Sequence, residues 1–99
     1  MQTKDFQKLG AKIVSGVDEK YNLKRDGQLA VAQLVEELGE LAKEVNLEKL
    51  RSKKPRKKDL EDEFADVLLQ FCKLADMFDV DLEKAVLDKI EVLKKRHSL

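Results

Sequence analysis

Four acidic residues stand in two pairs that share one spacing. Glu37 and Glu40 are three residues apart in LVEELGELAKEV, and Glu63 and Asp66 are three apart in DEFADVLL. Each residue of an α-helix turns the chain by about 100°, so residues three apart share a face, with Cβ atoms roughly 5–6 Å apart. If both stretches are helical, the two carboxylates of each pair can share a cation.

The acids lie at the edge of apolar stripes rather than opposite them, because Glu37 and Glu40 are each followed by a leucine and Asp66 by Val67. Carboxylates that are partly withdrawn from water repel one another and lose hydration, so such a cluster persists only with protons or cations. Oxygen ligands at this density suit Mg²⁺ or Mn²⁺. The competing interpretation is a solvated helix face whose acids pair with lysines such as Lys43.

Two further acids flank the first pair. Glu44 lies one helical turn beyond Glu40, so it is a possible additional ligand or base, while Glu36 is more simply explained by pairing with a lysine.

Apolar residues at three- and four-residue spacing predict the two helices that carry the pairs, at about 28–50 and 59–78. Between them RSKKPRKK, residues 51–58, has six basic residues in eight around the only proline, which predicts a solvated loop. If the two helices pack antiparallel across this loop, the acid pairs meet in a cluster of four carboxylates.

The same spacing predicts two more helices. One runs over about 3–22, and another follows Asp81, a residue type that favours the N-cap. We expect the apolar residues of this last helix to form a buried stripe, which comprises Leu82, Ala85, Val86, Ile90 and Leu93. The prediction is an all-α, four-helix chain forming one domain over residues 1–99.

Composition limits the function classes. Twenty basic and twenty acidic residues give a net charge of zero, so no overall field draws the chain to nucleic acid or an anionic membrane. Only the local run at 51–58 leaves nucleic-acid contact or phosphate contact open. The single Cys72 cannot form an internal disulfide, and no apolar run has the length of a membrane span, so we expect a cytoplasmic protein. A chain of 99 residues has a thin core, which favours a homo-oligomer.

The two pairs together resemble a family signature. Glu37-Leu-Gly-Glu40, followed after twenty-two residues by Glu63-Phe-Ala-Asp66, is similar to the ExxE…ExxD pattern of the MazG-like all-α nucleoside triphosphate pyrophosphohydrolases, which include dimeric dUTPases and dCTP pyrophosphatases. The runs LVEELGEL and ADVLLQFCKLADMFDVDLEKAV extend the similarity over about 28–96.

This resemblance implies a MazG-like helical bundle built from a homodimer or a dimer of dimers. It implies Mg²⁺-dependent hydrolysis of a nucleoside triphosphate to the monophosphate and pyrophosphate, for house-cleaning or control of nucleotide pools, with Mn²⁺ as a substitute metal. The two acid pairs would hold the metal and carry the catalysis, and Lys89 and Arg96 would bind phosphates, in a site that two subunits can share.

The sequence departs from the family at the end of the last helix, where Arg96-His97-Ser98 stands in place of an aromatic-proline pair, and at two single positions. Leu93 stands where members commonly have asparagine, and Leu47 stands where some relatives place a tryptophan against the base. Base and sugar preference therefore does not carry over. Two alternatives stay open: a phosphoribosyl-ATP pyrophosphatase, and a catalytically silent interaction protein of the same fold, for which Leu93 is the main argument.

Overall fold

The computed structural model describes residues 2–99, which form five α-helices and no strand. Their bounds are α1 Thr3–Lys20, α2 Gly27–Val45, α3 Leu47–Arg51, α4 Lys57–Met77 and α5 Leu82–His97. Within this part of the chain, every helix falls short of the length and apolar character that crossing a membrane requires. The all-α prediction is confirmed.

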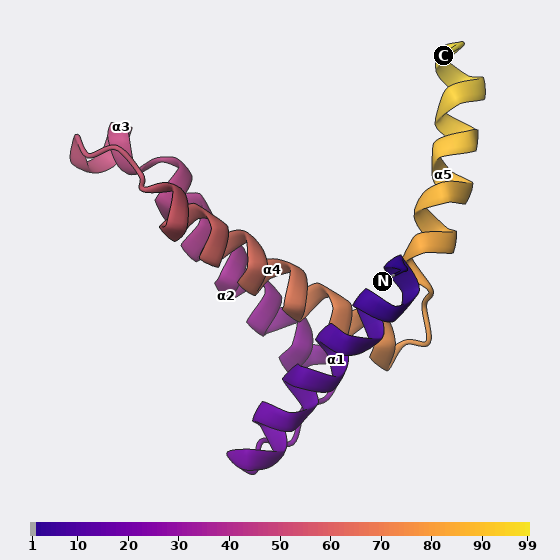
Figure 1. Ribbon diagram of the computed structural model, residues 1–99, viewed down its shortest axis with the longest axis horizontal. Helices are drawn as coiled ribbons and strands as arrows, with labels where there is room; N and C mark the ends of the chain where they lie inside the picture. Colours follow the sequence, from indigo (N-terminus) through magenta and orange to yellow (C-terminus); the bar gives the residue numbers. More distant parts are fainter. Residues whose placement is uncertain (1) are drawn as a thin grey trace.

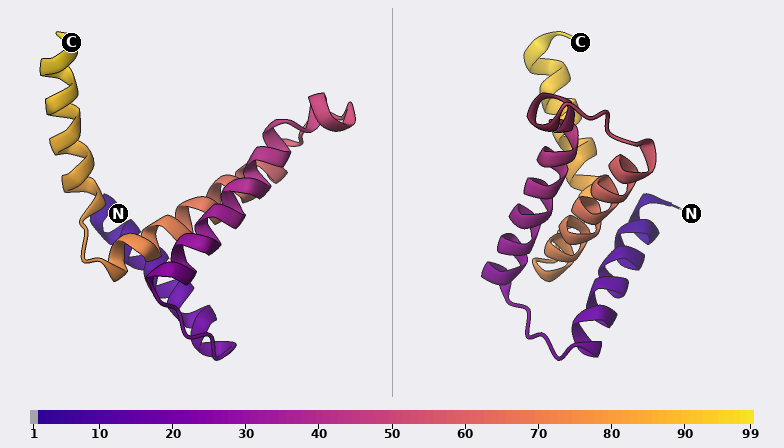
Figure 2. Two further views of the ribbon diagram at one scale, coloured as in Figure 1. Left: turned by 180° about the vertical axis from the view of Figure 1, so that it is seen from behind. Right: turned by 90° about the vertical axis from the view of Figure 1, so that its left-hand side faces the viewer.

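Helix α4 lies in the middle, with α1 packed on one side of it and α2 on the other (Figure 2). α2 and α4 run antiparallel along one arm of a V, and α5 forms the other arm (Figure 1). The antiparallel arrangement brings the middle of α2 to the middle of α4. This is the arrangement that the two acid pairs need in order to meet.

The second predicted helix is interrupted, which corrects its expected end near residue 50. α2 stops at Val45, and the backbone leaves the helical conformation at Asn46, with φ −96° and ψ 11°. The Ala42 carbonyl oxygen accepts from both the backbone N–H of Asn46, at 3.0 Å, and its Nδ2, at 2.8 Å. The short α3 follows and ends at Ser52, whose φ of 52° is left-handed. The expected loop 51–58 therefore shrinks to residues 52–56, since Lys57 and Lys58 begin α4.

Side-chain hydrogen bonds fix the start of α5. Asp81 accepts a bond at Oδ1 from the Lys84 amide at 3.1 Å, which confirms the predicted N-cap. From α1, Gln7 donates to the Val80 carbonyl oxygen at 2.7 Å and accepts from the Leu82 amide at 2.9 Å. The turn between α4 and α5 is thus tied to α1, while the rest of α5 leads away.

The core of a single chain is built from small residues. The buried apolar side chains within residues 2–99 belong to Ala11, Val14, Ala30, Cys72 and Ala75. At the crossing of α1 and α4, a Cβ atom on Gly10 would lie 3.3 Å from Leu69 Cδ2, so glycine permits this close approach. α5 has no buried residue, so the predicted burial of its apolar stripe is wrong for the isolated chain.

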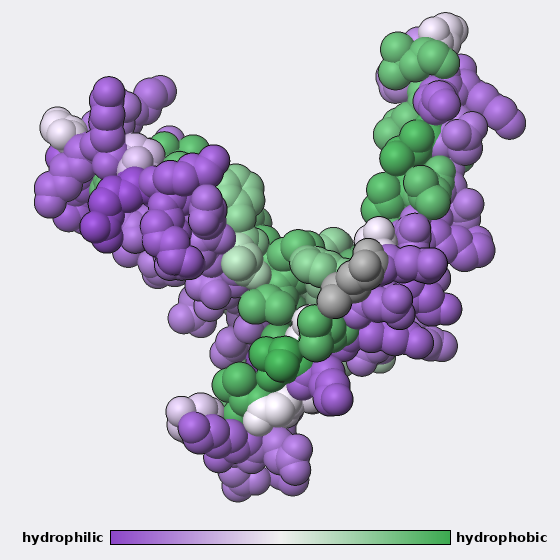
Figure 3. Space-filling view, in the orientation of Figure 1, coloured by the Kyte–Doolittle hydropathy of each residue, from purple (hydrophilic) through white to green (hydrophobic). Residues whose placement is uncertain are grey.

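Large apolar side chains remain exposed on every long helix. They lie along α1, across the middle of the molecule and along α5, as the green surface in Figure 3 shows. The exposed set includes Phe6, Leu9, Ile13 and Val17 on α1, Val31, Val35 and Leu38 on α2, Phe64, Leu68 and Phe71 on α4, and Val86, Ile90 and Leu93 on α5. The predicted apolar stripes are therefore present on the helices, but much of their surface is exposed to solvent.

Both the radius of gyration and the accessible surface show that the chain is open. The radius of gyration is 16.1 Å, whereas a compact domain of this length has about 13 Å. The accessible surface is 7920 Å², roughly 2,000 Å² more than the surface expected for a compact monomer of 11.4 kDa. The chain is therefore more open than a compact monomer of its length.

Candidate metal centre

Three of the four predicted acids meet between α2 and α4. Glu37 from α2, with Glu63 and Asp66 from α4, places one carboxylate oxygen each so that all three lie within 4.8 Å of one another. Glu37 and Glu63 are half-buried and Asp66 is exposed. The group thus has an open side through which a ligand can reach it.

The electrostatics of this group favour a cation. Burial, followed by the negative charges of Asp66 and Glu63, raises the pKa of Glu37. Burial, followed by the charges of Asp66 and Glu40, likewise raises the pKa of Glu63. Each shift reports an ionised form that is destabilised by its neighbours, and a divalent cation would remove that repulsion. The donor set, which is all oxygen, fits Mg²⁺ or Mn²⁺.

Glu40 and Glu44 lie beside the group rather than in it. Glu40 forms an exposed ion pair with Lys43 at 3.8 Å, yet its charge still acts on Glu37 and Glu63. Oε2 of Glu44 is buried without a hydrogen-bond partner within residues 2–99. Both side chains line a hollow of about 460 Å³ whose other walls include Arg51 and Lys53 of the basic run.

A second cavity opens directly at the acidic group. Glu37 and Asp66 line it on one side, and its volume is about 270 Å³. Two amides also line the cavity: Gln33, one helical turn before Glu37 on α2, and Gln70, one helical turn after Asp66 on α4. The remaining lining residues are Ile13, Val14, Val17, Asp18, Tyr21, Leu23, Arg25 and Leu69.

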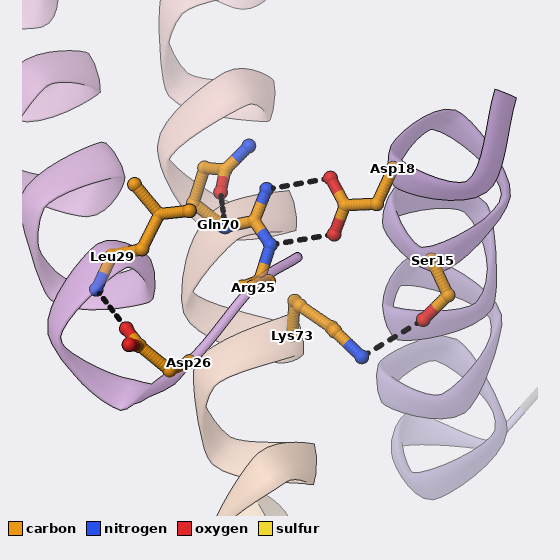
Figure 4. A network of polar contacts seen from close by, with 7 residues as sticks. All are labelled: Ser15, Asp18, Arg25, Asp26, Leu29, Gln70 and Lys73. Carbon is orange, nitrogen blue, oxygen red and sulfur yellow. Dashed lines mark hydrogen bonds and ion pairs between the residues drawn. The ribbon is translucent and has the colours of Figure 1, made fainter. Parts of the chain in front are cut away.

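A buried ion pair forms the polar end of this cavity (Figure 4). Arg25 donates from Nε and Nη2 to the two oxygens of Asp18, at 2.7 and 3.0 Å, and from Nη1 to Gln70 Oε1 at 2.9 Å. Its side chain is 5 % exposed and that of Asp18 is 11 % exposed. The contact joins α1, the loop before α2, and α4.

Two further hydrogen bonds stabilise the region around the ion pair of Asp18 and Arg25. Lys73 of α4 donates to Ser15 of α1 at 2.8 Å, and Asp26 caps α2 by accepting from the Leu29 amide at 2.8 Å (Figure 4). Sequence reasoning missed the Asp18–Arg25–Gln70 contact. In the sequence, Arg25 is one of several basic residues in an ordinary turn, and no spacing rule links it to Gln70.

The predicted phosphate-binding residues lie elsewhere. Lys89 and Arg96 belong to α5, which diverges from the arm formed by α2 and α4 (Figure 1). Within one chain, the cations that line the hollow beside Glu40 are Lys43, Arg51 and Lys53 instead. Lys89 and Arg96 therefore stay predictions that depend on a second chain.

Comparison with known proteins assigns the family. The family model of the MazG nucleotide pyrophosphohydrolase domain matches residues 25–98, a span that includes both acid pairs, the basic run and α5. Comparisons with curated proteins and with solved structures gave no match. Since the matched span covers most of the chain and includes the acidic group between α2 and α4, the chain belongs to the MazG nucleotide pyrophosphohydrolase family.

Proposed function

We propose that the chain is a Mg²⁺-dependent enzyme that hydrolyses a nucleoside triphosphate to the monophosphate and pyrophosphate. The observation that carries this proposal is the convergence of Glu37, Glu63 and Asp66 within 4.8 Å, beside a cavity of about 270 Å³ that Glu37 and Asp66 line. Pockets for drug-sized ligands hold roughly 300–1,000 Å³, so this cavity suits a base and part of its sugar. The triphosphate would then extend over the acids.

The acids would bind the metal and accept a proton in this reaction. Glu37, Glu63 and Asp66 would hold the metal, with Glu40 and Glu44 available from the neighbouring turns of α2. Bound magnesium supplies a Lewis acid that offsets phosphate charge and lowers the pKa of an attacking water. One carboxylate of the group accepts the proton that this water loses. Mn²⁺ has the same ligand preference and should substitute.

Basic side chains must offset the negative charge of the phosphate oxygens that the metal does not contact. Lys43, Arg51 and Lys53 are available within one chain, since they line the same hollow as Glu40 and Glu44. Lys89 and Arg96 would act from a second chain. Basic side chains on phosphate oxygens form charge-assisted hydrogen bonds, which are stronger than neutral ones.

A homodimer, or a dimer of dimers, would complete the fold. Each chain exposes roughly 2,000 Å² more than a compact monomer would, and much of its exposed surface is apolar. Obligate interfaces bury roughly 2,000–5,000 Å² in total, so the excess on two chains matches one such interface. The unburied stripe on α5 is the surface that this proposal assigns to the partner. Cys72, a buried free thiol, is compatible with a reducing cytoplasm.

A product assay tests the activity. The purified protein is incubated with canonical and damaged nucleoside triphosphates and with phosphoribosyl-ATP, in Mg²⁺ and in Mn²⁺, and pyrophosphate and orthophosphate are measured separately. We expect pyrophosphate with an equal amount of monophosphate, and none in the presence of a chelator. Release of orthophosphate would indicate a different bond cleavage. No turnover on any substrate would favour the silent interaction protein.

A further inference from the structure

The cavity beside the acidic group contains an amide whose orientation is fixed by the protein. The guanidinium group of Arg25 carries five donors and no acceptor. The Gln70 atom that it contacts at 2.9 Å is therefore the carbonyl oxygen, Oε1. The rotation of Arg25 is in turn fixed by its two bonds to Asp18. Gln70 thus has one permitted orientation of its amide.

This orientation leaves the Nε2 end of Gln70 available to a ligand. Nε2 makes no hydrogen bond with residues 2–99 and is not among the buried unpaired atoms, while Gln70 lines the cavity. It offers two N–H donors and no acceptor. Gln33, on the facing helix, makes no side-chain hydrogen bond with the described residues 2–99, so its amide can rotate to suit either a donor or an acceptor.

The position of Gln70 relative to the acids determines which part of a nucleotide it meets. Gln70 follows Asp66 by one helical turn, about 6 Å along α4. With the phosphates on the acids, the base points along the cavity toward Gln70 and Arg25. The edge that reaches Gln70 is then the one farthest from the sugar, at position 4 of a pyrimidine or position 6 of a purine.

That edge carries different groups in different bases. Thymine and guanine have a carbonyl oxygen there, whereas cytosine and adenine have an amino group. Uracil and hypoxanthine resemble the first class. A carbonyl accepts a hydrogen bond from Nε2, whereas an amino group would place two donors against each other and leave both unpaired. We propose that Gln70, fixed by Arg25, makes this enzyme selective for nucleotides whose base carries a carbonyl at that position.

The expected size of the preference follows from hydrogen-bond energies. An unmade bond in a partly buried site, together with a desolvated donor, corresponds to a factor between about 10 and 100. This inference rests on the proposed function, because it places the phosphates on the acidic group. It goes further by naming the class of base.

Two matched pairs of nucleotides test the inference: dUTP against dCTP, and ITP against ATP. Within each pair the substrates differ at the critical position and in the proton on the adjacent ring nitrogen. We expect kcat/KM to be at least about tenfold higher for dUTP and ITP. Gln70→Leu should bring both ratios close to one, mainly through KM, whereas Gln33→Leu should weaken all four substrates alike. Gln28→Leu, on α2 but outside the cavity, serves as the control.

A binding measurement without metal or turnover gives an independent result. The products dUMP and dCMP are compared by their effect on thermal unfolding in the presence of a chelator, and dUMP should stabilise the protein more. Equal kcat/KM within both pairs, or a preference for the amino bases, would overturn the role of Gln70 even if the enzyme is active. No turnover of any nucleotide would overturn the proposed function, while equal product binding would still refute the selectivity.

Discussion

Asp18 and Arg25 form an ion pair with both side chains almost completely buried, although they are seven residues apart on either side of a turn. Removing one charge from such a pair leaves the other buried and unpaired, which costs about 3–5 kcal/mol. We therefore expect Asp18→Asn to lower the free energy of unfolding by about that amount. Urea unfolding followed by circular dichroism measures it.

The chain provides a matched control for this variant. Arg56 and Asp59 form a pair with the same geometry, at 2.9 Å, but their side chains are 82 % and 37 % exposed. Asp59→Asn should cost less than about 1 kcal/mol, because exposed pairs contribute little. Equal losses from the two variants would show that Asp18 and Arg25 are more solvated than the structure indicates.

Stability without metal should depend on pH in two opposite ways. The raised pKa values of Glu37 and Glu63 mean that the folded chain binds protons more readily than the unfolded chain. Unfolding free energy should therefore increase as the pH falls from 7 toward the ordinary glutamate value of 4.5. Hydrogen bonding from Arg25 lowers the pKa of Asp18, so its contribution is lost as the pH falls below 3.8.

Melting temperatures at pH 7, 5 and 3, measured with a chelator, should thus pass through a maximum in mildly acidic solution. Saturating Mg²⁺ should remove the rise between pH 7 and pH 5, because the metal then offsets the repulsion at neutral pH. A melting temperature that falls steadily from pH 7 downward would contradict the assigned shifts of the two glutamates.

Magnesium should stabilise the protein through the acidic group. A ligand that binds only the folded chain contributes about 2.7 kcal/mol at a hundred times its Kd. Glu63→Gln should abolish both this stabilisation and turnover, and Asp66→Asn should do the same. Without metal, each variant should melt higher than the wild type, because one repelling charge is gone.

Glu61→Gln is the control for this test, since it makes the same chemical change on the same helix at an exposed position outside the group. It should keep the response to Mg²⁺ and the activity. If Glu61→Gln and Glu63→Gln lose the response equally, the effect of the metal would be one of general charge screening.

The α5 stripe should hold two chains together. Ile90→Lys puts a charge into the stripe, whereas Glu91→Gln changes the net charge by the same amount on the opposite side of α5. Light scattering should show a homo-oligomer for the wild type and for Glu91→Gln, and a smaller species for Ile90→Lys. The wild type should also melt at a temperature that depends on its concentration. A folded, active monomer at micromolar concentration would refute the assembly.

The sequence predicted what local rules determine. The spacing of the two acid pairs predicted a cluster of four carboxylates, of which Glu37, Glu63 and Asp66 meet while Glu40 lies beside them. Asp81 was correctly identified as a cap. The end of α2 was missed because the apolar periodicity continues past Asn46, although the backbone leaves the helical conformation there. The contact between Arg25 and Gln70 was missed because it joins residues 45 positions apart.

The error on α5 has a different origin. Its apolar residues recur every three or four positions, as they do in a buried helix. Periodicity shows that these residues share one face, but it does not show which surface covers that face. Val86, Ile90 and Leu93 are all exposed within one chain. A pattern in the sequence thus predicts that a helix face is covered, whereas the structure of one chain shows only what that chain itself covers.

The divergence of α5 also bears on the order of events during synthesis. α1, α2 and α4 leave the ribosome before α5, and their mutual contacts need no residue beyond Met77. At about 5–20 residues per second, α5 is added within a few seconds of α4, so the three helices pack as α4 emerges and α5 follows directly behind it. The newly made chain would then have α1, α2 and α4 packed together and the apolar face of α5 still exposed. Chains translated close together on one messenger would meet in that state, before either had diffused away.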